Sequence, residues 1–177
     1  MTVASLVLAA LAFLAALLTA AALVEVYGRV QALSAIAGIS DQQRTVELKS
    51  LGDKPSLHGL PPDFDDYSGM LLFVSPRCNT CHEIARSLDG SYSELRLVIT
   101  GADPGSCLEW MSTYDLDPEI CTIDQGYAIA DSIGVDATPL AILLDDGYMT
   151  AALTVPTAQT VLEMLGSIQE KATRRAV

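Results

Sequence analysis

Short apolar runs alternate with segments of helical periodicity over residues 70–175, and this alternation constrains the fold more than any other feature of the chain. Apolar runs of strand length occupy residues 70–75, 94–100, 119–123, 139–147 and 149–155. Apolar residues recur at helical spacing in residues 79–89, 105–116, 126–134 and 157–175. Strands that alternate with helices predict a largely parallel sheet between helical layers, and the last two strands predict an antiparallel hairpin at its edge. We therefore expect an α/β fold with a mixed sheet flanked by helices.

Two cysteines follow the first of these apolar runs directly, in SPRCNTCHEI at residues 75–84. The spacing Cys-x-x-Cys is typical of thiol–disulfide exchange, whereas Cys-x-x-Cys-His also attaches c-type haem. Haem would take His82 as one iron ligand and usually a methionine as the other. Met111, Met149 and Met164 fall where a helix or strand needs an apolar core residue. The position between a strand and a helix favours a redox dithiol, and no cofactor is expected.

A second motif, GVDATPLAILL at residues 134–144, places Pro139 at the start of a buried strand, where proline is tolerated. Thr138 lies 57 residues after Cys81. Together with the strand MLLFVS, the motif CNTC, the helix after it and the final hairpin and helix, this stretch resembles the thioredoxin superfamily over residues 61–170. The stretches LLFVSPRCNTC and GLPPDF are similar to its membrane-anchored extracytoplasmic branch, which includes methylamine-utilisation accessory and cytochrome-c-maturation proteins.

The resemblance implies a bacterial, thioredoxin-like thiol–disulfide oxidoreductase with a cis bond before Pro139. Thr138 and Pro139 would then bind an extended substrate peptide by strand addition. It also implies that Asn79 and Thr80 tune the reduction potential. Typical thioredoxins carry a buried acid six residues before the first cysteine, and this chain has Leu72 there. Proton handling must therefore differ, through His82, Glu83 or water.

The chemistry expected of the motif divides between its two cysteines. Cys78 lies at a helix N-terminus, where unpaired backbone N–H groups and the helix dipole stabilise a thiolate. Arg77 adds a positive charge beside it. Cys81 lies one turn further on and faces the protein. We assign Cys78 as the nucleophile and Cys81 as the resolving thiol.

Two further cysteines, Cys107 and Cys121, leave three interpretations open. They form a structural disulfide, they act as a relay dithiol, or they are two buried free thiols. A helix that carries Cys107 would run antiparallel to a strand that carries Cys121. The length covered along the helix and the length covered back along the strand are similar, so the two cysteines would lie at roughly the same height, which favours the structural disulfide. A zinc site is disfavoured, because no second Cys-x-x-Cys exists, and no metal is expected.

The N-terminal segment is strongly apolar: residues 2–24 contain no charged side chain. As a helix they would span roughly 34 Å, enough to cross a bilayer. A cleaved signal peptide is the alternative, but no Lys or Arg precedes the apolar run. We expect an anchor at residues 1–27, a juxtamembrane helix or linker at 28–60 and the thioredoxin-like domain at 61–177. Arg29 and Arg44 favour a cytoplasmic domain weakly, whereas four cysteines favour an oxidising compartment, and we give the cysteines more weight.

These features predict a single-pass protein of the cell membrane whose extracytoplasmic domain exchanges disulfides with exported proteins and is recharged by a membrane redox partner. The formal net charge of −12 disfavours nucleic acid as a partner. One alternative is a tethered binding or assembly factor with structural cysteines. Another is a thiol peroxidase of the same fold, although Ser75 stands where peroxiredoxins carry threonine.

Overall fold

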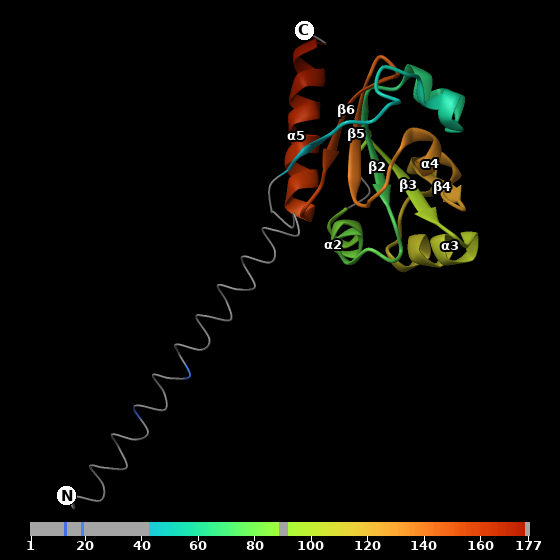
Figure 1. Ribbon diagram of the computed structural model, residues 1–177. Coiled ribbons are helices and arrows are strands. Elements are labelled where there is room, and N and C mark those ends of the chain that lie inside the picture. Colours follow the sequence, from blue (N-terminus) through green and yellow to red (C-terminus); the bar gives the residue numbers. More distant parts are fainter. Residues whose placement is uncertain (1–12, 14–18, 20–42, 89–91, 176–177) are drawn as a thin grey trace, which may run out of the picture. The chain divides into compact units, whose positions relative to one another are not determined.

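The computed structural model describes residues 13, 19, 43–88 and 92–175 (Figure 1). The chain divides into two compact units, Met1–Ser40 and Asp41–Val177, and the fold below is that of the second. Among the residues described, no helix is long and apolar enough to cross a membrane. The anchor expected at residues 1–27 lies outside the described residues except for Phe13 and Thr19, and it stays a prediction.

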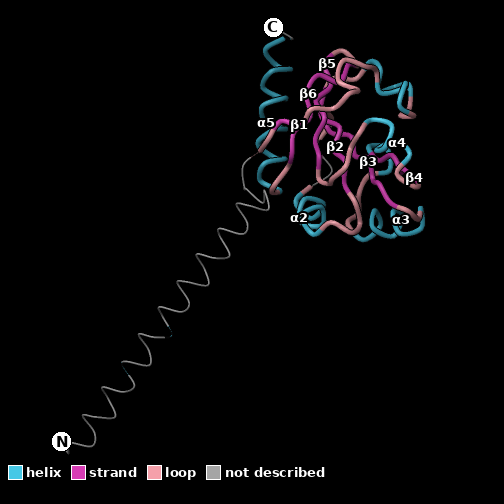
Figure 2. The backbone as a smooth tube through the Cα atoms, in the orientation of Figure 1, coloured by secondary structure: helices cyan, strands magenta, loops and turns pink. Residues whose placement is uncertain are grey.

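A six-stranded mixed sheet forms the centre of the domain, in the order β1-β6-β5-β2-β3-β4 (Figure 2). Its strands are β1 (Thr45–Val46), β2 (Gly69–Val74), β3 (Leu95–Gly101), β4 (Cys121–Gln125), β5 (Leu140–Asp145) and β6 (Tyr148–Thr154). β2, β3 and β4 are parallel, whereas β5, β6 and β1 continue the sheet in antiparallel fashion. The mixed sheet and the final hairpin are thus confirmed.

Within residues 43–88 and 92–175, four α-helices alternate with these strands as the periodicity predicts. They are α2 (Asn79–Ser87), α3 (Pro104–Thr113), α4 (Ala128–Ile133) and α5 (Ala158–Arg175). Local sequence determines where these helices begin, as α3 shows. The Asp103 side chain accepts a hydrogen bond from the N–H of Ser106 at 2.9 Å, and Pro104 occupies the first turn.

The helices cover both faces of the sheet, which is why β2 reads as an unbroken apolar run. On one face Leu72 and Val74 pack with residues of α2, α3 and α5. On the other face Leu71 and Phe73 pack with residues of α4. The carboxyl end of β2 therefore lies between two cores, and the segment that follows it carries the cysteine motif.

The folded unit begins earlier than the predicted boundary at residue 61. Thr45 and Val46 pair with β6, and Leu48 and Leu60 are buried in the core under α4. Ser50 donates a hydrogen bond from Oγ to a backbone carbonyl of α4 at 2.8 Å. Residues 43–60 thus belong to the domain. β1 is an edge strand of the sheet, and the short 3₁₀ helices η1 (Pro55–His58) and η2 (Pro62–Asp66) form in the segment that joins it to β2.

Candidate active site

The cysteine motif starts where β2 ends. The backbone N–H of Cys78 donates to the carbonyl of Ser75 at 3.1 Å, which closes the turn between β2 and α2. Cys78 then caps α2: its backbone is extended, and its Sγ accepts a hydrogen bond from the N–H of Cys81 at 3.1 Å. The sulfur of Cys78 therefore lies at the N-terminus of α2, where partial positive charge gathers.

Cys78 and Cys81 form a disulfide with a Cα–Cα distance of 5.2 Å, within the range such bonds require. The two sulfurs differ in exposure. Cys78 is half-buried, whereas Cys81 is fully buried against the core that contains Leu72. A partner thiol can reach Cys78 first, which agrees with the predicted division of roles.

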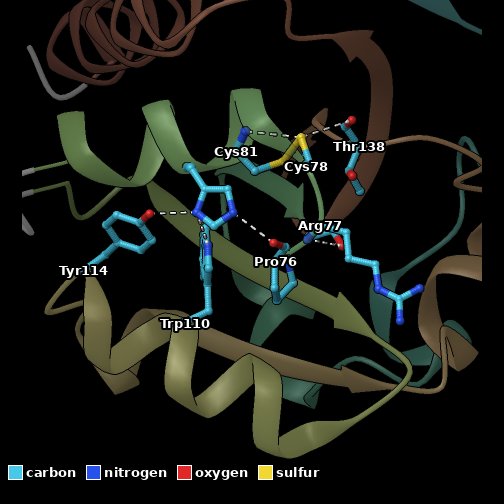
Figure 3. The surroundings of a disulfide bond; sticks show 9 residues. Pro76, Arg77, Cys78, Cys81, Trp110, Tyr114 and Thr138 are labelled. Carbon is cyan, nitrogen blue, oxygen red and sulfur yellow. Dashed lines mark hydrogen bonds between the residues drawn. A yellow bond between two sulfur atoms is a disulfide. The ribbon is translucent and has the colours of Figure 1, made fainter.

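The second predicted motif faces the disulfide. The peptide bond between Thr138 and Pro139 is cis, and the carbonyl oxygen of Thr138 lies 3.5 Å from Sγ of Cys78 (Figure 3). Both residues are half-buried, and β5 begins directly after them. The structure thus brings together four residues that are up to 61 positions apart in the sequence, Cys78, Cys81, Thr138 and Pro139.

The three supporting residues lie around the motif. Asn79 is exposed and Thr80 is half-buried in the first turn of α2. The backbone N–H of Arg77 donates to Oγ of Ser75 at 3.4 Å, and its guanidinium extends away from the disulfide (Figure 3). Arg77 therefore acts on the sulfur of Cys78 only as a distant, solvated charge.

A hydrogen-bond network that the sequence did not predict lies behind the motif. The indole N–H of the buried Trp110 donates to Nδ1 of His82 at 3.0 Å, and the hydroxyl of Tyr114 lies 2.6 Å from the same nitrogen. Because indole is a donor only, Nδ1 is the acceptor, and Nε2–H donates to the carbonyl of Pro76 at 2.8 Å. His82 thus joins α2, α3 and the turn that carries Cys78. Because both ring nitrogens take part in hydrogen bonds, neither is free to bind the iron of a haem.

The structure places a leucine where typical thioredoxins have a buried acid. Leu72 is fully buried in the same core as Cys81. Among the described residues Asp124 is the one buried carboxylate, and its oxygens accept hydrogen bonds from the backbone of Ile129 and Ala130 at 2.8 and 3.0 Å. That carboxylate holds α4 in place, so it is not a base for Cys81.

The disulfide expected between Cys107 and Cys121 does not form, and both are free thiols. Cys121 is the first residue of β4, because Pro118–Ile120 forms a 3₁₀ turn instead of strand. It pairs with Leu97, whereas Cys107 packs against Gly101, four residues further along β3. At about 3.3 Å per residue the two are roughly 13 Å apart along the strands, too far for a disulfide.

Neither of these thiols is activated. Burial raises the pKa of Cys107, and burial together with the nearby Asp117 carboxylate raises the pKa of Cys121 to about 11. Since the thiolate is the reactive form, both are poor nucleophiles at neutral pH, and a relay role is disfavoured. In the part of the chain that the structure describes, no group of three His, Cys, Asp or Glu side chains could hold a metal ion.

A mixed sheet of this order, with a Cys-x-x-Cys disulfide at the start of the helix after β2 and a cis-proline facing it, defines a thioredoxin-like domain. No protein-family model matches the sequence, and none of the curated proteins is significantly similar to it in sequence. Solved structures do match.

One similar structure is a secreted Mycobacterium tuberculosis disulfide oxidoreductase homologous to Escherichia coli DsbE. It is 20% identical, with a TM-score of 0.50 over 66% of this chain and 93% of that one. Mycobacterium tuberculosis DsbF is 14% identical, with a TM-score of 0.47 over 58% of this chain and 81% of that one. StoA of Bacillus subtilis is 16% identical, with a TM-score of 0.41 over 56% and 82%. The first of these similarities supports the thioredoxin-like fold.

Proposed function

We propose that the domain is an enzyme that exchanges disulfides with protein substrates through Cys78 and Cys81. One observation carries this proposal: a half-buried sulfur at a helix N-terminus is bonded to a buried one and faces the carbonyl before a cis-proline. A permanent structural disulfide needs neither an accessible sulfur nor a neighbouring backbone acceptor.

The reaction begins from the reduced form. The thiolate of Cys78, stabilised by the N–H of Cys81 and by the end of α2, attacks one sulfur of a substrate disulfide. The substrate S–S bond breaks, a mixed disulfide forms, and one substrate thiolate leaves and takes up a proton. The thiolate of Cys81 then attacks Sγ of Cys78, which releases the second substrate thiol. Two electrons have passed to the substrate, and the reverse sequence oxidises a dithiol.

The substrate would bind as an extended strand across Thr138 and Pro139. The carbonyl of Thr138 is already beside the reactive sulfur and can accept a hydrogen bond from a substrate N–H. We further propose that residues 1–27 anchor the chain in the cell membrane with the domain outside the cytoplasm. Exported proteins would then be the substrates, and a membrane protein would restore the redox state. The apolar N-terminal segment supports the anchor, and the partial exposure of Cys78 supports exchange with protein substrates.

Replacing Cys78 by serine tests the function. The full-length chain is purified in detergent, and the release of thiol from a disulfide-linked peptide is followed. We expect the Cys78→Ser variant to release none, and the Cys81→Ser variant to stop at the mixed disulfide. A Cys107→Ser/Cys121→Ser variant is the matched control and should keep full activity. Turnover by the Cys78→Ser variant would refute the role of Cys78 as the nucleophile. A wild-type chain that releases no thiol would refute the exchange function and favour a binding or assembly factor with structural cysteines.

The direction of exchange is measured on the same control variant by alkylating its thiols in a series of redox buffers. A potential near about −270 mV would make the domain a reductant, and one near about −120 mV would make it an oxidant.

A further inference from the structure

The turn that carries Cys78 is held by hydrogen bonds from more than one side, and His82 supplies one of them. The backbone N–H of Cys78 donates to the carbonyl of Ser75 at 3.1 Å, and the N–H of Arg77 donates to Oγ of Ser75 at 3.4 Å. Nε2–H of His82 donates to the carbonyl of Pro76 at 2.8 Å, which is shorter than both (Figure 3). Because proline has no backbone N–H, its carbonyl is the one backbone group by which Pro76 can be held.

His82 contacts this turn at two points. Its backbone N–H donates to the carbonyl of Cys78 at 3.2 Å, and its ring donates to Pro76. The ring keeps this direction because its other nitrogen, Nδ1, accepts from the indole of Trp110 and lies beside the hydroxyl of Tyr114. The two aromatic rings also pack against the imidazole, with centroids 6.0 and 5.6 Å away. The direction of Nε2 is therefore set by side chains of α3 and of its C-terminal cap.

The hydrogen bond to Pro76 has a different weight in the two redox states. In the oxidised chain the disulfide ties Cys78 to α2 covalently, so this hydrogen bond adds little to the position of the turn. In the reduced chain the covalent tie is gone, and non-covalent contacts alone keep Sγ of Cys78 at the N–H of Cys81. A thiolate is stabilised by the partial positive charge at the helix end, so a turn that moves away from this end destabilises the thiolate.

We propose that His82 is a positioning residue that favours the reduced form, because it holds the turn in place after the disulfide opens and so keeps the Cys78 thiolate at the N-terminus of α2. It acts through the carbonyl of Pro76 and not as an acid or a base. Its presence raises the reduction potential, which makes the disulfide form a stronger oxidant. This inference rests on the exchange function proposed above.

The reduction potential of the full-length chain in detergent tests this role. Every variant is made in the Cys107→Ser/Cys121→Ser background, so that the thiols that are alkylated belong to Cys78 and Cys81. Each variant is equilibrated in a series of glutathione redox buffers. A net hydrogen bond of ordinary strength corresponds to about tenfold in an equilibrium constant. We therefore expect His82→Leu to shift the equilibrium about tenfold toward the disulfide, which lowers the potential by about 30 mV.

Three further variants separate positioning from stability. Trp110→Phe removes the indole N–H but keeps Nε2–H of His82 on Pro76 and Tyr114 beside Nδ1, so its equilibrium should stay within about twofold of the wild type. His82→Gln has an amide that can donate to Pro76 and accept from Trp110, and it should recover most of the shift. His58→Leu is the matched control: it removes the histidine of η1 instead and should leave the equilibrium unchanged.

The pH dependence of alkylation tests whether the thiolate is the cause. Iodoacetamide reacts with the thiolate, so the pH at which alkylation of Cys78 is half-maximal reports the acid dissociation of that thiol. In a Cys81→Ser background, His82→Leu should move this midpoint to higher pH. The His82→Leu/Trp110→Phe double variant leaves no indole donor unpaired, and it should show both changes even where His82→Leu alone does not fold.

The outcomes distinguish the positioning role from the exchange function. An equilibrium within about twofold of the wild type in folded His82→Leu, or an equal shift in Trp110→Phe, would refute the positioning role and leave the exchange function standing. A shifted potential with an unchanged alkylation midpoint would also refute it, because the thiolate would not be the cause. If Cys78 and Cys81 of the wild-type chain do not equilibrate with glutathione at all, the exchange function fails, and the positioning role fails with it.

Discussion

Replacing His82 by leucine tests whether the imidazole holds three parts of the site together. Leucine is similar in size but leaves the indole N–H of Trp110 and the carbonyl of Pro76 without a partner. Trp110 is 5% exposed, so water cannot replace its lost acceptor, and a buried donor of this kind costs about 1–3 kcal/mol. Pro76 is half-buried, so its carbonyl adds less. We expect the free energy of unfolding to fall by about 2–4 kcal/mol.

Urea unfolding of the oxidised full-length chain measures this loss. At a slope of about 2 kcal/mol per molar urea, the midpoint should fall by about 1–2 M. Trp110 is the one tryptophan of the chain and part of the network, so the transition is followed by far-ultraviolet circular dichroism. His58→Leu is the matched control. Its ring is half-buried, but its partners Asp53 and Ser132 are exposed, so water can replace the lost ring nitrogens there, and the cost should stay below about 1 kcal/mol.

A double-mutant cycle with Trp110→Phe isolates the indole–imidazole bond. Phenylalanine keeps an aromatic ring but has no N–H, so His82→Leu no longer leaves a buried donor unpaired in that background. The losses in free energy of unfolding of the two single variants should therefore sum to about 1–2 kcal/mol more than the loss of the double variant. An additive cycle, or a His82→Leu variant within about 0.5 kcal/mol of the wild type, would refute the reasoning.

Three further predictions concern residues outside this network. Thr100→Val should raise the free energy of unfolding by about 1 kcal/mol, because it removes an unpaired buried hydroxyl, and a loss in urea unfolding would show that the hydroxyl is satisfied. Since the pKa of Cys121 is raised to about 11, its alkylation in the folded protein should stay slow at pH 8 and accelerate as the pH rises toward 11; fast labelling at pH 8, detected by mass spectrometry, would contradict this. Gly101→Ala should lower the thermal midpoint, because its Cβ would lie 2.8 Å from Sγ of Cys107, and Cys107→Ala should restore it; an equal loss in both backgrounds would exclude this clash.

The alternation of strands and helices was predictable because each element from residue 70 onward has a strong local signal. β2 is apolar throughout, and α2 and α5 carry apolar residues at helical spacing. The start of the domain was not predictable in this way. Leu48 and Leu60 stand among glycines, prolines and acids, and β1 exists only because β6 lies beside it. Pairing between residues 45 and 153 leaves no periodic trace in either segment.

The site shows the same division between local and distant information. Cys78, Cys81 and Pro139 lie in motifs that are legible in the sequence, and the structure brings them together. The partners of His82 were missed, although Trp110 and Tyr114 are four residues apart and hence share one face of a predicted helix.

The apolar surroundings of Cys81 determine how its proton can leave. Leu72 offers no base, and the carboxylate of Asp124 is held by the backbone of α4. His82 donates from Nε2 and accepts at Nδ1 within its own network, so it is not free to accept this proton either. The first step of exchange, however, releases a substrate thiolate beside Cys78, one helical turn from Cys81. That substrate thiolate is the nearest base to Cys81. When it takes the proton of the Cys81 thiol, it leaves as a thiol. We therefore expect the resolving step to depend on the basicity of the thiol that the substrate releases, more than in a domain that carries a buried carboxylate beneath its second cysteine.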